Sequence, residues 1–233
     1  MKKTNLKING IPSILWGETS ERLYIFVHGK LSCKEDAADF AEIACKKGYQ
    51  VLSFDLPEHG QRKDEGLACD VWNGIKDLQT VGFYVLQGGW KEIFLFANSL
   101  GAYFSLLAYT DYPFKSCLFL SPILNMERLI QNMLLWSHTG EQELEEKGLI
   151  PTEFGETLDW RYYTYVKEHP IKKWDVPTCI LYPSADHLTE RNVVDAFVSE
   201  FRADLVVFPN GEHWFHTEEQ LAFLRQWLEE HIT

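Results

Sequence analysis

The sequence predicts a single α/β domain whose mostly parallel sheet is covered by helices on both faces. The chain has 233 residues, of which 45% are hydrophobic, enough for one sizeable core. Short, continuous apolar runs alternate with helical patterns, which is typical of βαβ units. Runs without polar alternation are expected of strands that are buried on both faces. These observations favour one large domain over two small ones.

The chain begins with a predicted β-hairpin, because extended pieces at 6–8 and 13–16 flank Asn9-Gly10, a strong two-residue turn signal. Further strands are predicted at the apolar runs 23–27, 51–54, 93–96, 117–120, 179–182 and 205–208. Helices are predicted at 32–47, 71–86, 102–109, 191–201 and 221–232. Capping-box patterns precede the first of these helices, at Ser32 to Glu35, and the last, at Thr217 to Gln220.

One segment interrupts the alternation of strands and helices. Residues 123–177 are too long for a simple crossover loop and have helical rather than strand character. Helical patterns cover 123–136, 141–147 and 158–166 within it. We therefore expect a helical cap at 123–177, inserted into a core made of 1–122 and 178–233.

Charge and cysteine content limit the classes of function. A net charge of −12 disfavours nucleic-acid binding, which depends on clustered lysine and arginine. No apolar run is long enough to predict insertion into a membrane. The five cysteines are an odd number without a Cys-x-x-Cys pair, as expected of reduced thiols in a cytoplasmic protein. No His-x-x-x-His occurs on a helix, so neither a metal nor another cofactor is predicted.

Ser99 lies in Ala97-Asn98-Ser99-Leu100-Gly101, between a predicted strand and a predicted helix. Small residues on either side allow the sharp turn that exposes a nucleophilic hydroxyl at the end of a sheet. An ordinary helix N-cap serine is the alternative interpretation. The pentapeptide alone does not decide between the two.

Asp186 and His213 follow Ser99 in the order that a hydrolase triad on this kind of fold requires. A serine hydroxyl needs a base to accept its proton, and a carboxylate can orient that base. The nearest substitutes are Glu190 for Asp186 and His216 for His213. We expect His187, beside Asp186, to face away from the site.

Four motifs in order give the chain a resemblance to the α/β-hydrolase superfamily, and within it to small cytosolic serine esterases and monoacylglycerol-lipase-type enzymes. They are Val27-His28-Gly29-Lys30, Asp55-Leu56-Pro57-Glu58-His59-Gly60, the serine turn, and the late loops of Asp186 and His213. The resemblance implies an α/β-hydrolase fold with a cap before the strand that precedes the catalytic Asp. It also implies catalysis by Ser99, Asp186 and His213, with an oxyanion hole formed by the backbone N–H groups of Lys30 and Leu100.

The chain departs from the superfamily pattern at two positions. Ala97 stands where a glycine is usual, and Glu58 stands where Asp-x-Pro-Gly-His-Gly has glycine. Side chains that could line a substrate pocket are His28, Trp136, Trp160 and Tyr163. Orienting the loops is the alternative role for His28, and forming the core of the cap is the alternative for the aromatic cluster.

The function predicted from the sequence is hydrolysis of small to medium carboxylic esters through an acyl-enzyme, with a small-molecule ester as partner. A thioesterase, an amidase or peptidase and an acyltransferase use the same triad, so these alternatives stay open. The alternative that is not an enzyme is a catalytically silent hydrolase fold that serves in ligand binding or protein interaction. The pattern does not predict an oligomeric state.

Overall fold

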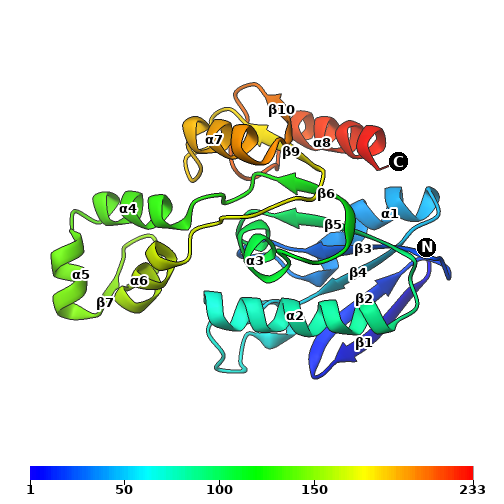
Figure 1. Cartoon of the computed structure of the whole chain (residues 1–233), viewed down its shortest axis with the longest axis horizontal. Helices are drawn as coiled ribbons and strands as arrows, with labels where there is room; N and C mark the ends of the chain where they lie inside the picture. Colours follow the sequence, from blue (N-terminus) through cyan, green and yellow to red (C-terminus); the bar gives the residue numbers. More distant parts are fainter. Residues whose placement is uncertain (233) are drawn as a thin grey trace.

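A computed structural model describes residues 1–232 and contains an eight-stranded sheet in the order β1-β2-β4-β3-β5-β6-β9-β10 (Figure 1). The strands are β1 (Lys3–Ile8), β2 (Ile11–Trp16), β3 (Arg22–Val27), β4 (Gln50–Phe54), β5 (Glu92–Asn98), β6 (Phe114–Leu120), β9 (Thr178–Pro183) and β10 (Asp204–Phe208). Neighbouring strands from β4 to β10 pair in parallel, while β1 and β2 pair antiparallel with each other and β2 with β4. The predicted fold class is therefore confirmed.

The first hairpin forms at the predicted turn. Asn9 and Gly10 have φ values of 48° and 91°, the left-handed pair that a tight hairpin turn needs. Ile8 then pairs with Ile11, so the ladder continues up to the turn. This hairpin occupies one edge of the sheet, and β10 occupies the other.

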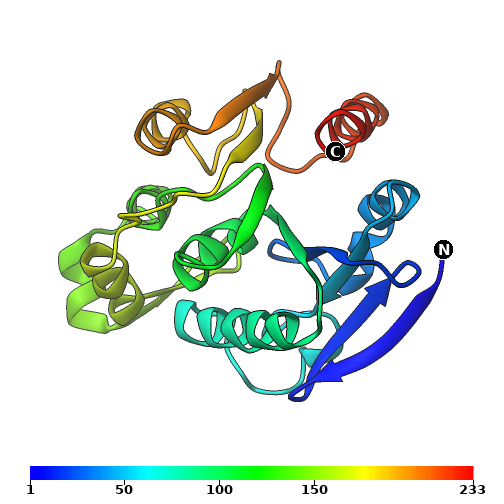
Figure 2. The same cartoon turned by 45° about the vertical axis from the view of Figure 1, so that its right-hand side comes forward.

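Helices cover both faces of the sheet (Figure 2). They are η1 (Lys34–Ala37), α1 (Ala38–Lys46), η2 (Gly60–Arg62), α2 (Val71–Gln87), α3 (Leu100–Ala108), α7 (Arg191–Phe201) and α8 (Glu218–His231). Helices α1 and α8 pack on one face and share a core cluster with Tyr24 and Phe26 of β3. Helices α2, α3 and α7 pack on the other face, around Leu23 and Ile25. Alternate residues of one strand thus feed two cores, which explains its continuous apolar run.

Between β6 and β9 the chain forms α4 (Met126–Trp136), α5 (Glu141–Lys147), β7 (Leu149–Pro151), β8 (Thr157–Asp159) and α6 (Trp160–Glu168). These elements project from the carboxyl end of the sheet (Figure 1). Strands β7 and β8 form an antiparallel hairpin that the sequence prediction missed. Each spans three residues, too few to show an alternating pattern. We call residues 123–177 the cap.

Two helices begin with caps that the sequence prediction did not place. The first predicted helix begins as the 3₁₀ turn η1, whose N-cap is Cys33 rather than Ser32, with Asp36 completing the capping box. In the cap, α4 begins after Asn125, whose side chain accepts a hydrogen bond from the N–H of Arg128. The predicted capping box at Thr217 and Gln220 is confirmed. Within residues 1–232, every helix is too short or too polar to cross a bilayer.

Candidate active site

Ser99 lies in a strained turn between β5 and α3. Its φ and ψ are 50° and −118°, a conformation that few residues other than glycine adopt. Ser99 occupies the N-cap position of α3, but its hydroxyl makes no capping bond, so the interpretation as an ordinary capping serine is wrong. A Cβ at Gly101 would lie 2.4 Å from the carbonyl oxygen of His28, which means that only glycine allows α3 to start this close to β3. Local strain and close packing therefore direct the Ser99 side chain away from its own helix.

The Ser99 hydroxyl contacts His213, which lies in the loop between β10 and α8. Ser99 Oγ and His213 Nε2 are 2.8 Å apart. His213 Nδ1 lies 2.8 Å from Asp186 Oδ2, in the loop after β9. The Asp186 carboxylate is fully buried and the His213 side chain is 12% exposed. The structure thus brings three side chains from separate loops into one hydrogen-bonded chain.

Backbone groups hold the Asp186 carboxylate. Its Oδ1 accepts hydrogen bonds from the N–H groups of Leu188 at 2.8 Å and Thr189 at 3.1 Å. Its Oδ2 is left to accept a hydrogen bond from His213 Nδ1–H. This arrangement keeps Nε2 of the neutral ring available as an acceptor for the Ser99 hydroxyl.

The substitutes considered from the sequence have other partners. Glu190 accepts hydrogen bonds from Arg128 Nη2 at 2.8 Å and from Asn132 at 3.2 Å. His216 stacks on Trp214, with ring centroids 4.8 Å apart. Neither residue contacts Ser99, so the geometry favours Asp186 and His213 as the partners of Ser99.

The loop after β3 passes directly beside Ser99. A Cβ at Gly29 would lie 3.0 Å from Cβ of Ser99, so a larger residue at this position would crowd the serine turn. Within residues 1–232, the backbone N–H groups of Lys30 and Leu100 donate to no other protein group. The neighbouring N–H of Leu31 does donate, to His59 Nε2 at 3.0 Å. Two free donors therefore flank the Ser99 turn.

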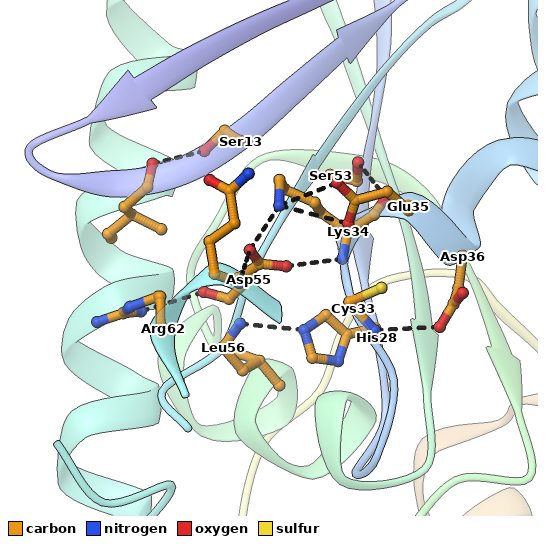
Figure 3. A network of polar contacts seen from close by, with 12 residues as sticks. Ser13, His28, Cys33, Lys34, Glu35, Asp36, Ser53, Asp55, Leu56 and Arg62 are labelled. Carbon is orange, nitrogen blue, oxygen red and sulfur yellow. Dashed lines mark hydrogen bonds and ion pairs between the residues drawn. The ribbon is translucent and has the colours of Figure 1, made fainter. Parts of the chain in front are cut away.

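Two buried histidines join the loops after β3 and β4. His28 Nε2 accepts a hydrogen bond from the N–H of Leu56 at 3.0 Å, so His28 Nδ1 carries the proton and donates to the Gly29 carbonyl at 2.7 Å (Figure 3). His59 Nε2 likewise accepts a hydrogen bond from the N–H of Leu31, so His59 Nδ1 carries the proton and donates to the Pro57 carbonyl. The pKa of His28 is lowered to about 4, mainly by burial and in smaller part by the nearby His59. His28 is therefore neutral at pH 7 and orients the loops.

A buried ion pair joins the same two loops. Asp55 is fully buried and accepts from Lys34 Nζ at 2.6 Å and from the Lys34 N–H at 2.9 Å (Figure 3). Asp55 Oδ2 also accepts from the N–H of Gln61. Sequence reasoning missed this pair, because Lys34 and Asp55 lie 21 positions apart with no motif that joins them. The anchor holds the start of η1 against the end of β4.

The four predicted pocket residues have different surroundings. His28 is 1% exposed and both ring nitrogens are occupied, so its pocket assignment is replaced by the loop-orienting role. Trp136 is 42% exposed and packs on Phe154 within the cap. Tyr163 is fully buried and donates to Glu141, which makes it part of the cap's own core. Trp160 borders a surface hollow of about 370 Å³ between α2 and α6, and its contact with substrate stays a prediction.

The structure also defines the surroundings of three polar residues near the site. The ring of His187 lies 6.3 Å from that of His213, so His187 does not face away. Glu58 has a φ of 62°, and its carboxylate accepts from the N–H of Cys69 at 2.8 Å. Lys30 is paired with Glu156 of the cap. The charges of Glu58 and Lys30 are thus engaged with the protein in this structure.

A family model described as "Serine aminopeptidase, S33" matches residues 18–145, which is more than half of the chain. The chain belongs to this family. The matched stretch of this S33 family member includes Ser99 and the loops after β3 and β4, and it ends before Asp186 and His213. No curated protein matches the chain.

Solved structures with the same fold cover nearly the whole chain. Est1E from Butyrivibrio proteoclasticus, with ferulic acid bound, is 18% identical with a TM-score of 0.75, covering 97% of this chain and 96% of its own. Mouse alpha/beta hydrolase domain-containing protein 10 is 16% identical with a TM-score of 0.74, covering 99% and 98%. The Pyrococcus furiosus esterase Pf2001 is 17% identical with a TM-score of 0.69, covering 98% and 90%. This S33 family member therefore has the α/β-hydrolase fold and resembles small serine esterases.

Proposed function

We propose that the chain hydrolyses small to medium carboxylic esters through an acyl-enzyme formed on Ser99. The observation that carries the proposal is the chain of two 2.8 Å contacts from Ser99 through His213 to Asp186. A hydroxyl 2.8 Å from an imidazole nitrogen can lose its proton to that ring as it attacks a carbonyl carbon. The buried Asp186 then stabilises the imidazolium.

The reaction proceeds in two halves. Ser99 Oγ bonds to the carbonyl carbon while His213 Nε2 takes its proton, and the oxyanion accepts hydrogen bonds from the N–H groups of Lys30 and Leu100. The ester C–O bond breaks as His213 returns the proton to the leaving alcohol. Water then attacks the acyl-enzyme while His213 takes its proton, and His213 returns this proton to Ser99 Oγ as the bond between Oγ and the acyl carbon breaks and the acid is released.

Support for ester substrates comes from proteins similar in fold, since Pf2001 is named as an esterase and Est1E binds ferulic acid, a carboxylic acid. The family description, serine aminopeptidase, makes amide hydrolysis the second candidate. The triad does not select the leaving group, so ester and amide cleavage need a direct comparison. The cytoplasmic location and the small-molecule partner stay predictions.

Covalent labelling tests the nucleophile. A fluorophosphonate probe is expected to label Ser99, as located by peptide mapping, and Ser99→Ala is expected to abolish both labelling and ester turnover. Ser199→Ala, which changes an exposed serine on α7, is the matched control and should keep both. Active protein that stays unlabelled at Ser99 would refute the proposal.

A substrate panel tests the class of reaction. We expect p-nitrophenyl esters of short and medium acids to be cleaved with higher kcat/KM than acyl-thioesters or aminoacyl amides. Turnover of aminoacyl amides that exceeds ester turnover would replace the esterase proposal by the second candidate. No turnover of any member would favour the catalytically silent alternative.

A further inference from the structure

The cap is tied to the loop that supplies one of the proposed oxyanion donors. Lys30 Nζ forms an ion pair with Glu156, which lies 126 positions later at the end of the turn between β7 and β8. The side chains of Lys30 and Glu156 are 43% and 31% exposed, so solvent screens the pair only in part. An ion pair thus links the projecting hairpin of the cap to the side chain of Lys30, whose backbone lies beside the Ser99 turn.

The Glu156 end of this contact is rigid. The N–H and the hydroxyl of Thr152 both donate to the Glu156 carbonyl at 2.8 Å, and the Glu156 N–H donates to Thr152 Oγ1 at 3.1 Å. Phe154, within the same turn, packs edge-to-face on Trp136 of α4 with ring centroids 6.1 Å apart. The turn therefore presents the Glu156 carboxylate from a fixed backbone.

The Lys30 end lies between two residues that are held in other ways. Gly29 packs against Ser99, where a Cβ would lie only 3.0 Å from the serine Cβ. Leu31 has a strained φ of 62°, and its N–H is held by His59. Lys30 lies between these fixed points, and its own N–H has no acceptor within the described chain. The ion pair with Glu156 is then the contact that restrains its side chain.

We propose that Glu156 is a positioning residue that keeps the Lys30 N–H directed at the oxyanion. The inference rests on the proposed function, and it deepens it by giving the cap a part in transition-state stabilisation. A hydrogen-bond donor of an oxyanion hole contributes most when its direction is set before the charge develops. Gly29 and Leu31 hold the backbone on either side of Lys30, so without Glu156 the Lys30 side chain is free to follow solvent and the direction of the Lys30 N–H is set less narrowly.

The test compares Glu156→Gln with the wild type on p-nitrophenyl acetate, with kcat expressed per fluorophosphonate-labelled site. We expect kcat to fall about fivefold to tenfold with little change in KM, because the weakened interaction is made mainly in the transition state. Added NaCl is expected to lower the wild-type kcat toward that of Glu156→Gln and to leave the variant unchanged. The exchanged pair Lys30→Glu with Glu156→Lys is expected to recover most of the lost kcat.

Glu143→Gln is the matched control, because it removes an ion pair with Lys147 that lies wholly within α5. It should keep the wild-type kcat and salt response. If Glu156→Gln keeps the kcat of the wild type, or if Glu143→Gln loses as much kcat as Glu156→Gln, the inference is overturned while the esterase proposal stays intact. A lower Tm with unchanged kcat per labelled site would also overturn it. Failure of Ser99 to label in active wild-type protein would refute the proposed function instead.

Discussion

Acidification is expected to destabilise the protein through His28. The ring is 1% exposed, and its Nε2 must stay unprotonated to accept the N–H of Leu56. Burial lowers its pKa from 6.5 to about 4. Between these values the unfolded chain binds a proton that the folded chain does not, so the free energy of unfolding falls as pH falls from about 6.5 toward 4.

The size of this effect follows from the difference in pKa. A shift from 6.5 to about 4 corresponds to about 3 kcal/mol over the whole window. About 2 kcal/mol of this is lost between pH 7 and pH 5. The contribution of neutral His28 to the free energy of unfolding is therefore present above about pH 6.5 and is lost by about pH 4.

Urea denaturation at pH 7 and pH 5 measures the effect. His28→Gln offers an amide oxygen near the position of Nε2 and does not titrate, so it should lose about 2 kcal/mol less than the wild type over this interval. His169→Gln, which replaces an exposed histidine of the cap, should keep the wild-type difference. Equal pH dependence in the wild type and His28→Gln would refute the reasoning.

Two further substitutions test the geometry of the site. Gly101→Ala places a Cβ 2.4 Å from the backbone oxygen of His28. We expect the free energy of unfolding, measured in urea, to fall by about 3 kcal/mol. A variant as stable as the wild type would show that α3 does not need this close approach. Asp186→Asn is expected to lower kcat for esters about 10⁴-fold with little change in KM, because the ring tautomer of His213 is no longer fixed. A loss of less than tenfold in steady-state kinetics would contradict the role assigned to the carboxylate.

Most of the core fold could be predicted from local patterns. Strand β9 is buried along its whole length and β3 from Leu23 onward, so their apolar runs are visible in the sequence. The cap was harder to predict. Its hairpin depends on the Thr152 bonds to Glu156, and three-residue strands leave no periodic signal. The division of the chain into core and cap stays a proposal about domain boundaries.

The polar contacts around the site divide in the same way. Ser99, Asp186 and His213 were found because each follows or lies near the end of a strand in a fixed order along the chain. The buried pair of Lys34 and Asp55 was not found, since ion pairing between distant positions has no sequence signature. The expectations for His187 and for His28 as a pocket residue were wrong because the direction of each side chain depends on tertiary contacts, with His213 and with Leu56.

The sequence by itself determined the alternation of strands and helices, the sharp turn at Ser99 and the order of the three polar residues, because these depend on neighbours a few positions away. Only the tertiary structure decided that Ser99, His213 and Asp186 meet at 2.8 Å and that the cap contacts Lys30 through Glu156. The physical reason is that such contacts form when the parallel sheet aligns the ends of β5, β9 and β10, which no local stretch of residues can specify.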